Sequence, residues 1–115
     1  MSVELTRLGD TLTAAVGGEI DHHTARAIRE CIDQGIQAAQ PKTLVLDMSG
    51  VSFMDSSGIG LIMGRCKLMN ETGGGIRITG ASSGIARMIK LAGLSRLGIE
   101  CGGADNRSKE KRALR

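Results

Sequence analysis

Short apolar runs with high strand propensity alternate with segments of helical periodicity along this chain, and that alternation constrains its fold most strongly. Residues 43–47 and 76–79 are β-prone runs, and residues 25–39 carry apolar side chains at three- and four-residue steps. Parallel strands need a long crossover connection, which is usually a helix. The alternation therefore predicts an α/β fold, with a mixed, mainly parallel sheet, right-handed crossovers and helices packed against the sheet.

The first residues follow a different pattern. Residues 3–8 and 11–16 alternate apolar and polar side chains on either side of the pair 9–10, Gly-Asp, which predicts an N-terminal β-hairpin. The chain has 115 residues, a length typical of one domain. We expect a single domain over residues 1–106 and a basic, disordered tail over residues 107–115.

The rest of the chain continues the alternation of helices and strands. A second helix is expected over about residues 56–70 and a third over about 83–92, because apolar side chains recur there and serines suited to helix caps precede them. A short last strand is expected near residues 99–100. The segment 49–55 is expected to be a loop between the strand at 43–47 and the second helix.

Charge and composition exclude several classes of function. The formal net charge is +3, but residues 1–106 carry ten basic and eleven acidic side chains, so the excess belongs to the tail. Phe53 is the sole aromatic residue, which argues against stacking of single-stranded nucleic acid. No apolar run is long enough for a membrane span, and no signal peptide is visible. These features, with three isolated cysteines (Cys31, Cys66 and Cys101), favour a cytoplasmic protein with no direct nucleic-acid partner and no membrane insertion.

The second predicted helix has little polar surface. Few of its residues are polar, and seven are apolar: Ile59, Leu61, Ile62, Met63, Cys66, Leu68 and Met69. Such a helix is either buried nearly all round or keeps an apolar face for a partner. Because a small domain has few places to bury a helix completely, we expect contact with a partner.

The segment 55–60, Asp-Ser-Ser-Gly-Ile-Gly, lies where the second helix begins. Asp and Ser are preferred N-caps, so capping alone explains much of the motif. The functional alternative is a serine hydroxyl exposed at a helix N-terminus, where a phosphate group is favoured. A similar Ser-Ser-Gly at residues 82–84 precedes the third helix, which shows that the pattern also arises for capping.

Other chemistries find little support in the sequence. The glycines Gly58, Gly60 and Gly64 do not match a dinucleotide fingerprint, although a nucleotide-binding enzyme stays as an alternative. His22 and His23 are adjacent and have no third candidate ligand for a metal. No hydrolase or P-loop motif occurs. We therefore expect no catalytic residues, no metal and no cofactor, and a protein that is not an enzyme.

Two segments taken together resemble one family. Residues 18–25, Gly-Glu-Ile-Asp-His-His-Thr-Ala, and residues 51–60, Val-Ser-Phe-Met-Asp-Ser-Ser-Gly-Ile-Gly, are similar to the STAS-domain anti-sigma factor antagonists. Within that family the likeness is greatest to the antagonists of the sporulation anti-sigma F factor. The resemblance covers about residues 3–100 and implies a STAS-like fold.

The resemblance also implies a mechanism of partner switching. The unphosphorylated antagonist binds an anti-sigma factor that is also a serine kinase, which releases the sigma factor. Phosphorylation of the serine after the motif aspartate, here Ser56, reverses the binding, and a PP2C-type serine phosphatase restores the free hydroxyl. The resemblance places these residues at the partner-binding surface: Asp21, Asp55, Ser57, Gly58, Ile59 and Arg65. A STAS-domain protein of another pathway, either general stress or a scaffold, is the alternative.

Overall fold

The computed structural model describes residues 1–94 and 100–102 of the chain. The five strands and three helices follow one another in this order: β1 (Ser2–Leu8), β2 (Thr11–Ile20), α1 (Ala25–Ala39), β3 (Thr43–Met54), α2 (Ser56–Glu71), β4 (Gly75–Thr79), α3 (Ser83–Leu91) and β5 (Glu100–Gly102). This order confirms the predicted hairpin followed by alternating helices and strands. The predicted tail, and with it the domain boundary at residue 106, lies outside the described residues.

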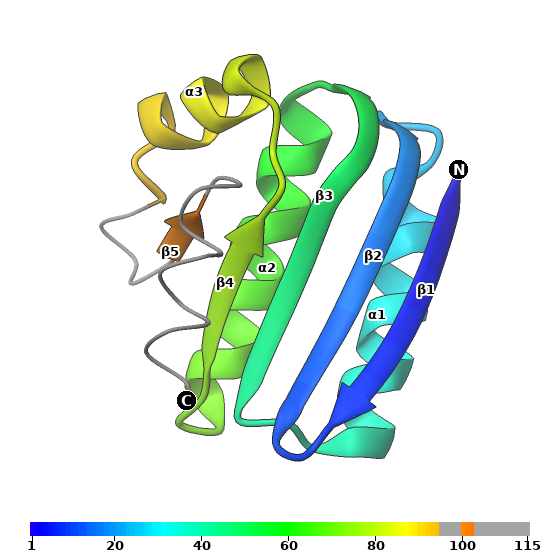
Figure 1. Ribbon diagram of the computed structural model, residues 1–115, viewed down its shortest axis with the longest axis vertical. Coiled ribbons are helices and arrows are strands. Elements are labelled where there is room, and N and C mark those ends of the chain that lie inside the picture. Colours follow the sequence, from blue (N-terminus) through cyan, green and yellow to red (C-terminus); the bar gives the residue numbers. More distant parts are fainter. Residues whose placement is uncertain (95–99, 103–115) are drawn as a thin grey trace.

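The strands form a five-stranded sheet in the order β1-β2-β3-β4-β5. β1 and β2 are antiparallel, and the other neighbouring strands are parallel. Figure 1 shows α1 and α2 covering one face of the sheet, with α3 beyond the end of β4. The α/β class with a mixed, mainly parallel sheet is therefore confirmed.

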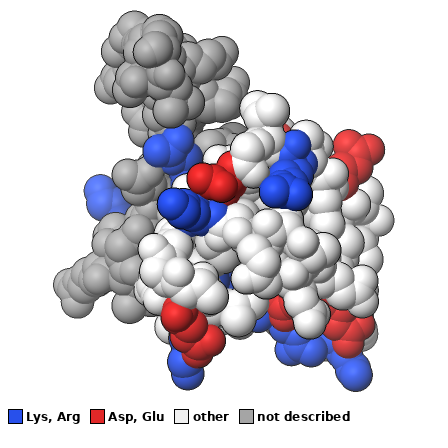
Figure 2. All heavy atoms as spheres, turned by 90° about the horizontal axis from the view of Figure 1, so that it is seen from below, with Lys and Arg blue, Asp and Glu red and all other residues white. Residues whose placement is uncertain are grey.

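The hydrophobic core lies between the sheet and these two helices. Alternate residues of the strands point into it, as the period of two requires, and helices α1 and α2 close it with residues such as Ile28, Ile32, Ile62 and Met69. Seen from the end that carries the β1–β2 turn, basic and acidic side chains are interspersed with uncharged surface (Figure 2). This end of the described part of the chain carries no extended patch of one sign.

The expected loop over residues 49–55 is wrong, because β3 continues to Met54. Its second half pairs in parallel with residues 17–20 of β2, with two shifts of register. Gly50 permits the close approach, since a Cβ there would lie 3.2 Å from the Val16 carbonyl oxygen. The side chains of Val51 and Met54 are buried, so the core continues to this end of the sheet.

Helix α2 keeps a smaller free apolar face than the sequence suggested. Four of its apolar side chains are buried, because the helix packs against β3, β4 and α1: Leu61, Ile62, Cys66 and Met69. Ile59 and Leu68 are half-buried, and Met63 is exposed. Neither Cys31 nor Cys66 forms a disulfide bond within the described residues, and the side chain of Cys101 lies outside them. No helix among the described residues is long and apolar enough to cross a membrane.

Candidate functional site at the carboxyl edge of the sheet

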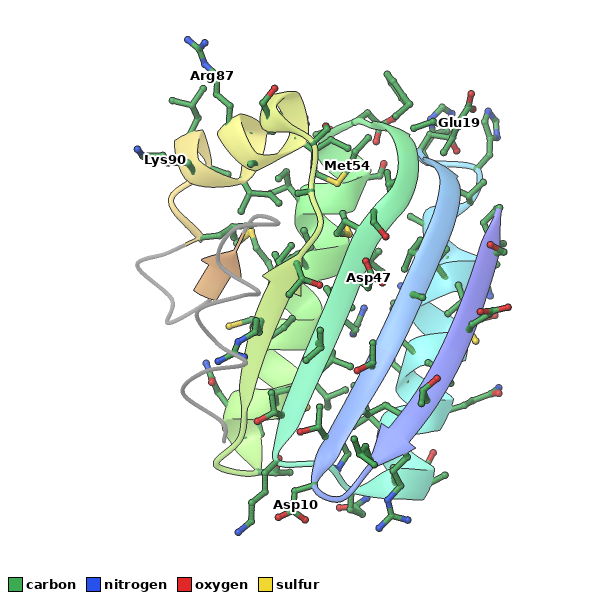
Figure 3. All side chains as sticks on the ribbon, viewed as in Figure 1. Asp10, Glu19, Asp47, Met54, Arg87 and Lys90 are labelled. Carbon is green, nitrogen blue, oxygen red and sulfur yellow. The ribbon has the colours of Figure 1, made fainter. Side chains whose placement is uncertain are left out.

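The strands β2 and β3 end next to one another, and we call this end of the sheet the carboxyl edge. Ile20 is in register with Met54, and the Asp55 N–H donates a 3.1 Å hydrogen bond to the Ile20 carbonyl oxygen. Figure 3 shows Met54 at this edge, close to the start of α2. The segments 21–24 and 55–57 therefore begin side by side, although thirty residues separate them in the sequence.

Asp55 is the N-cap of α2. Its backbone is extended, and its carboxylate accepts a 2.8 Å hydrogen bond from the Ser57 N–H. The Asp55 carbonyl oxygen accepts a second bond from the Gly58 N–H at 2.9 Å. The capping interpretation of the motif is thus confirmed for Asp55. Ser56, the next residue, is not the N-cap of α2.

Ser56 is the first residue of α2 and is exposed to solvent. Its hydroxyl makes no hydrogen bond within the described part of the chain. Ser82, in the similar motif before α3, behaves differently, because its hydroxyl accepts a 3.3 Å bond from the Ile85 N–H as a true N-cap. The two motifs therefore differ by one position: an aspartate caps α2, which leaves the Ser56 hydroxyl accessible at a helix N-terminus.

Gly58 holds the start of α2 against the end of β3. It is buried, and a Cβ at this position would overlap with the Met54 side chain. The residue therefore acts from the interior by allowing close packing, and it offers no surface to a partner. Ile59, also predicted at the partner surface, is half-buried and packs against the hydrophobic core.

Asp21 orders the turn that precedes α1. Its Oδ1 atom accepts hydrogen bonds from the N–H groups of His23 at 2.9 Å and Thr24 at 3.0 Å. Burial raises the pKa of the Asp21 carboxyl, but these hydrogen bonds outweigh it, so the pKa lies below its ordinary value of 3.8. The Thr24 hydroxyl donates to the Glu19 carbonyl oxygen at 2.9 Å, which fixes the turn to the end of β2.

Arg65 is almost completely buried between α2 and α1. It lies one helical turn after Leu61 and shares its buried face, so only 9% of its side chain is exposed. Its Nε atom lies 2.8 Å from Oδ1 of Asp33 on α1, in an ion pair that is not aligned as a hydrogen bond. Burial lowers the pKa of the guanidinium, Asp33 raises it and Arg29 lowers it further, so the pKa falls below its ordinary value. Arg65 therefore ties α2 to α1.

The structure brings together a subset of the predicted site residues. Asp21, Asp55, Ser56 and Ser57 lie on adjacent segments of the carboxyl edge, whereas Gly58 and Arg65 support it from the interior. Sequence reasoning missed the part played by Asp33, because nothing local relates it to a residue thirty-two positions away.

Phe53 is a second residue that the motif analysis did not use. It is half exposed and lies three positions before Ser56. The sequence feature that could have drawn attention to Phe53 is that it is the only aromatic residue of the chain.

The described residues do not support the two alternative chemistries, nucleotide binding at the glycines of α2 and metal binding. Gly58, Gly60 and Gly64 all lie inside α2, so they form no phosphate-binding loop, and the nucleotide-binding alternative based on that loop is wrong. The described residues contain no group of three or more histidine, cysteine or acidic side chains that could hold a metal ion.

Comparison with known proteins identifies the family to which a chain with this fold and this site belongs. The family described as "STAS domain" matches residues 2–101, and the chain belongs to this family. It is 34% identical over 97 residues to an anti-sigma F factor antagonist of Paenibacillus polymyxa, covering 84% of this chain and 83% of the relative. It is 30% identical to an anti-sigma-B factor antagonist of Staphylococcus aureus (strain NCTC 8325 / PS 47), covering 84% and 89%.

A solved structure shows the same arrangement. The anti-sigma factor antagonist SpoIIAA in its unphosphorylated form superimposes with a TM-score of 0.76, at 25% identity, and the match covers 97% of both chains. The resemblance found in the two sequence motifs is therefore confirmed at the level of family and fold.

Proposed function

We propose that this chain is an anti-sigma factor antagonist regulated by phosphorylation of Ser56. In its unphosphorylated form it binds an anti-sigma factor that is also a serine kinase, and so releases the sigma factor. The observation that carries the proposal is the Ser56 hydroxyl, which is exposed at the first position of α2 and makes no hydrogen bond with the described residues. The antagonist names of the relatives and the unphosphorylated form named for SpoIIAA support it.

A phosphate at Ser56 would act on the interface rather than on the fold. It adds a charge of about −1.5 to −2. The free N–H groups and the dipole at the start of α2 tolerate that charge, while the carboxylates of Asp55 and Asp21 oppose it. Against a partner surface complementary to the free hydroxyl, the same charge must be desolvated or repelled. A thousandfold loss of affinity requires only about 4 kcal/mol.

The chain itself needs no catalytic group in this scheme. It presents a hydroxyl, and the kinase supplies ATP, Mg²⁺ and the base. A PP2C-type serine phosphatase would reset the switch. We place this exchange in the cytoplasm, where the sigma factor meets RNA polymerase, with protein partners and no direct contact with nucleic acid.

The partner-binding role proposed for the site residues divides by position. Asp21, Asp55 and Ser57 lie beside Ser56 on the carboxyl edge and are proposed to contact the partner or to shape the surface that does. Gly58 and Arg65, both buried, are proposed to affect binding only by holding that edge in place.

The pathway is the main alternative within this function. The relatives include antagonists of both anti-sigma F and anti-sigma-B factors, at 34% and 30% identity. We propose the sigma F pathway, because the resemblance of residues 18–25 and 51–60 favours it. Calorimetry with an anti-sigma F and an anti-sigma-B factor as competing probes distinguishes the two pathways, since the cognate factor should bind more tightly.

The function is tested by incubation with these two anti-sigma factors and ATP, followed by mass spectrometry of the peptide that contains residues 51–65. We expect one phosphate on Ser56, none on Ser56→Ala, and an unchanged result with Ser83→Ala as the matched control. Ser83 is exposed at the first position of α3, as Ser56 is at the first position of α2, and it lies outside the proposed partner surface. Stoichiometric phosphorylation of Ser56→Ala would refute the site.

A further inference from the structure

A groove runs between α1 and α2 next to the carboxyl edge, and we call it the α1–α2 groove. Its volume is about 430 Å³. Arg26 and Arg29 of α1 line one side, Ser57, Gly60 and Gly64 of α2 line the other, and the buried Arg65 contributes to the groove from within. Because Ser57 follows Ser56 directly, the groove adjoins the proposed phosphorylation site.

The glycine side of the groove is open. Gly60 and Gly64 lie one helical turn apart, and a Cβ added to either would meet no described atom within 4 Å other than those of its chain neighbours and of its own helix backbone. Glycine in a helix interior is less favourable than alanine by about 1 kcal/mol. Packing within the described residues does not explain these two glycines, since alanine would fit at both positions. Their absent side chains instead leave the backbone of α2 accessible to an external group.

The charge of the groove has one sign. None of its lining residues is acidic, and the positive charges of Arg65 and Arg26 are paired outside the lining set, with Asp33 at 2.8 Å and with Glu30 at 3.2 Å. Arg29 has no acidic partner within the described part of the chain. After burial, the charge of Arg29 is a further cause that lowers the pKa of Arg65.

We propose that the α1–α2 groove binds an acidic segment of the anti-sigma factor, an inference that rests on the proposed function. Carboxylates of that segment would pair with the guanidinium groups of Arg29 and Arg26, and its backbone would lie against Gly60 and Gly64. An extended peptide fits this site better than a small free anion, because the groove is open and runs along a helical turn. A phosphate on Ser56 would place negative charge at the end of the same groove and repel the segment, which links the groove to the switch.

The first experiment does not depend on the partner. Uniformly ¹⁵N-labelled chain is titrated with a short glutamate-rich peptide, and a peptide with glutamine in place of glutamate serves as control. We expect amide shifts at Gly60, Gly64 and Arg29 that weaken with added salt and disappear in Arg29→Glu. Arg87→Glu is the matched control, since Arg87 points outward from α3 (Figure 3) and should leave the shifts unchanged.

The outcomes separate the proposal from its rivals. Absence of shifts with the glutamate peptide overturns it. Equal shifts with inorganic phosphate alone would mark a site for small anions and would also overturn it.

The second experiment uses whichever anti-sigma factor phosphorylates Ser56. Arg29→Glu should weaken its binding at least tenfold, and Gly60→Leu should weaken binding while keeping or raising the melting temperature, because leucine favours the helix. A factor that binds the wild type and Arg29→Glu equally overturns the groove proposal. A wild-type chain that binds neither factor contradicts the proposed function instead, and the peptide titration still decides the groove.

Discussion

Replacing Arg65 with methionine should destabilise the domain, because the change breaks the link between α2 and α1. Removing one partner of a fully buried ion pair costs about 3–5 kcal/mol, whereas an exposed pair is worth about 0–1 kcal/mol. Here Arg65 is 9% exposed, Asp33 is 36% exposed and the pair is not aligned as a hydrogen bond, so we expect a loss of about 1–3 kcal/mol. For a domain of this size that lowers the melting temperature by about 4–12 °C.

Thermal and urea unfolding followed by circular dichroism measure this loss. Lys67→Met, on the exposed side of the same helix, is the matched control and should change stability by less than about 0.5 kcal/mol. The double variant Arg65→Met/Asp33→Leu should recover most of the loss, since it leaves no unpaired charge. An unchanged melt of Arg65→Met together with lost partner binding would refute the structural role and restore Arg65 to the interface.

Three further predictions address the switch, the turn before α1 and the tail. Ser56→Asp should weaken binding to the anti-sigma factor in calorimetry while leaving the melt nearly unmoved; a collapsed melt would reveal a structural role instead. The folded-state pKa of Asp21 is depressed below 3.8, so its contribution to stability is present above that pH and is lost as the pH falls through the folded value. Asp21→Asn should therefore be less stable than the wild type at neutral pH in urea unfolding, with a difference that shrinks below pH 3.8; a constant difference contradicts this. Deleting residues 107–115 should leave partner affinity nearly unchanged at physiological salt, and a tenfold loss would show that the tail takes part in binding.

Much of the fold was predictable because its signals are local. The alternation of strand and helix patterns, the Gly9-Asp10 turn and the cap at Ser82 each depend on neighbouring residues, and each appears in the structure. The second half of β3 was missed because serine and glycine interrupt its apolar residues: Ser49, Gly50 and Ser52. They form a strand because β2 lies beside them, and Gly50 lets the two backbones approach.

The candidate site was predictable in part for the same reason. The motif around Ser56 is a local helix start, and the register of β2 and β3 brings Asp21 beside it, as the resemblance implied. The position of Arg65 was not predictable, because its orientation depends on how α2 packs against α1 and on an acidic residue far away in the chain. The resemblance placed Arg65 at the partner-binding surface, whereas its side chain is buried and paired with Asp33.

The most direct test of the switch compares the affinity of the cognate anti-sigma factor for the unphosphorylated and the Ser56-phosphorylated chain by calorimetry. We expect a loss of about a thousandfold on phosphorylation, corresponding to about 4 kcal/mol, with an unchanged circular-dichroism spectrum. Equal affinities for the two forms would contradict the account.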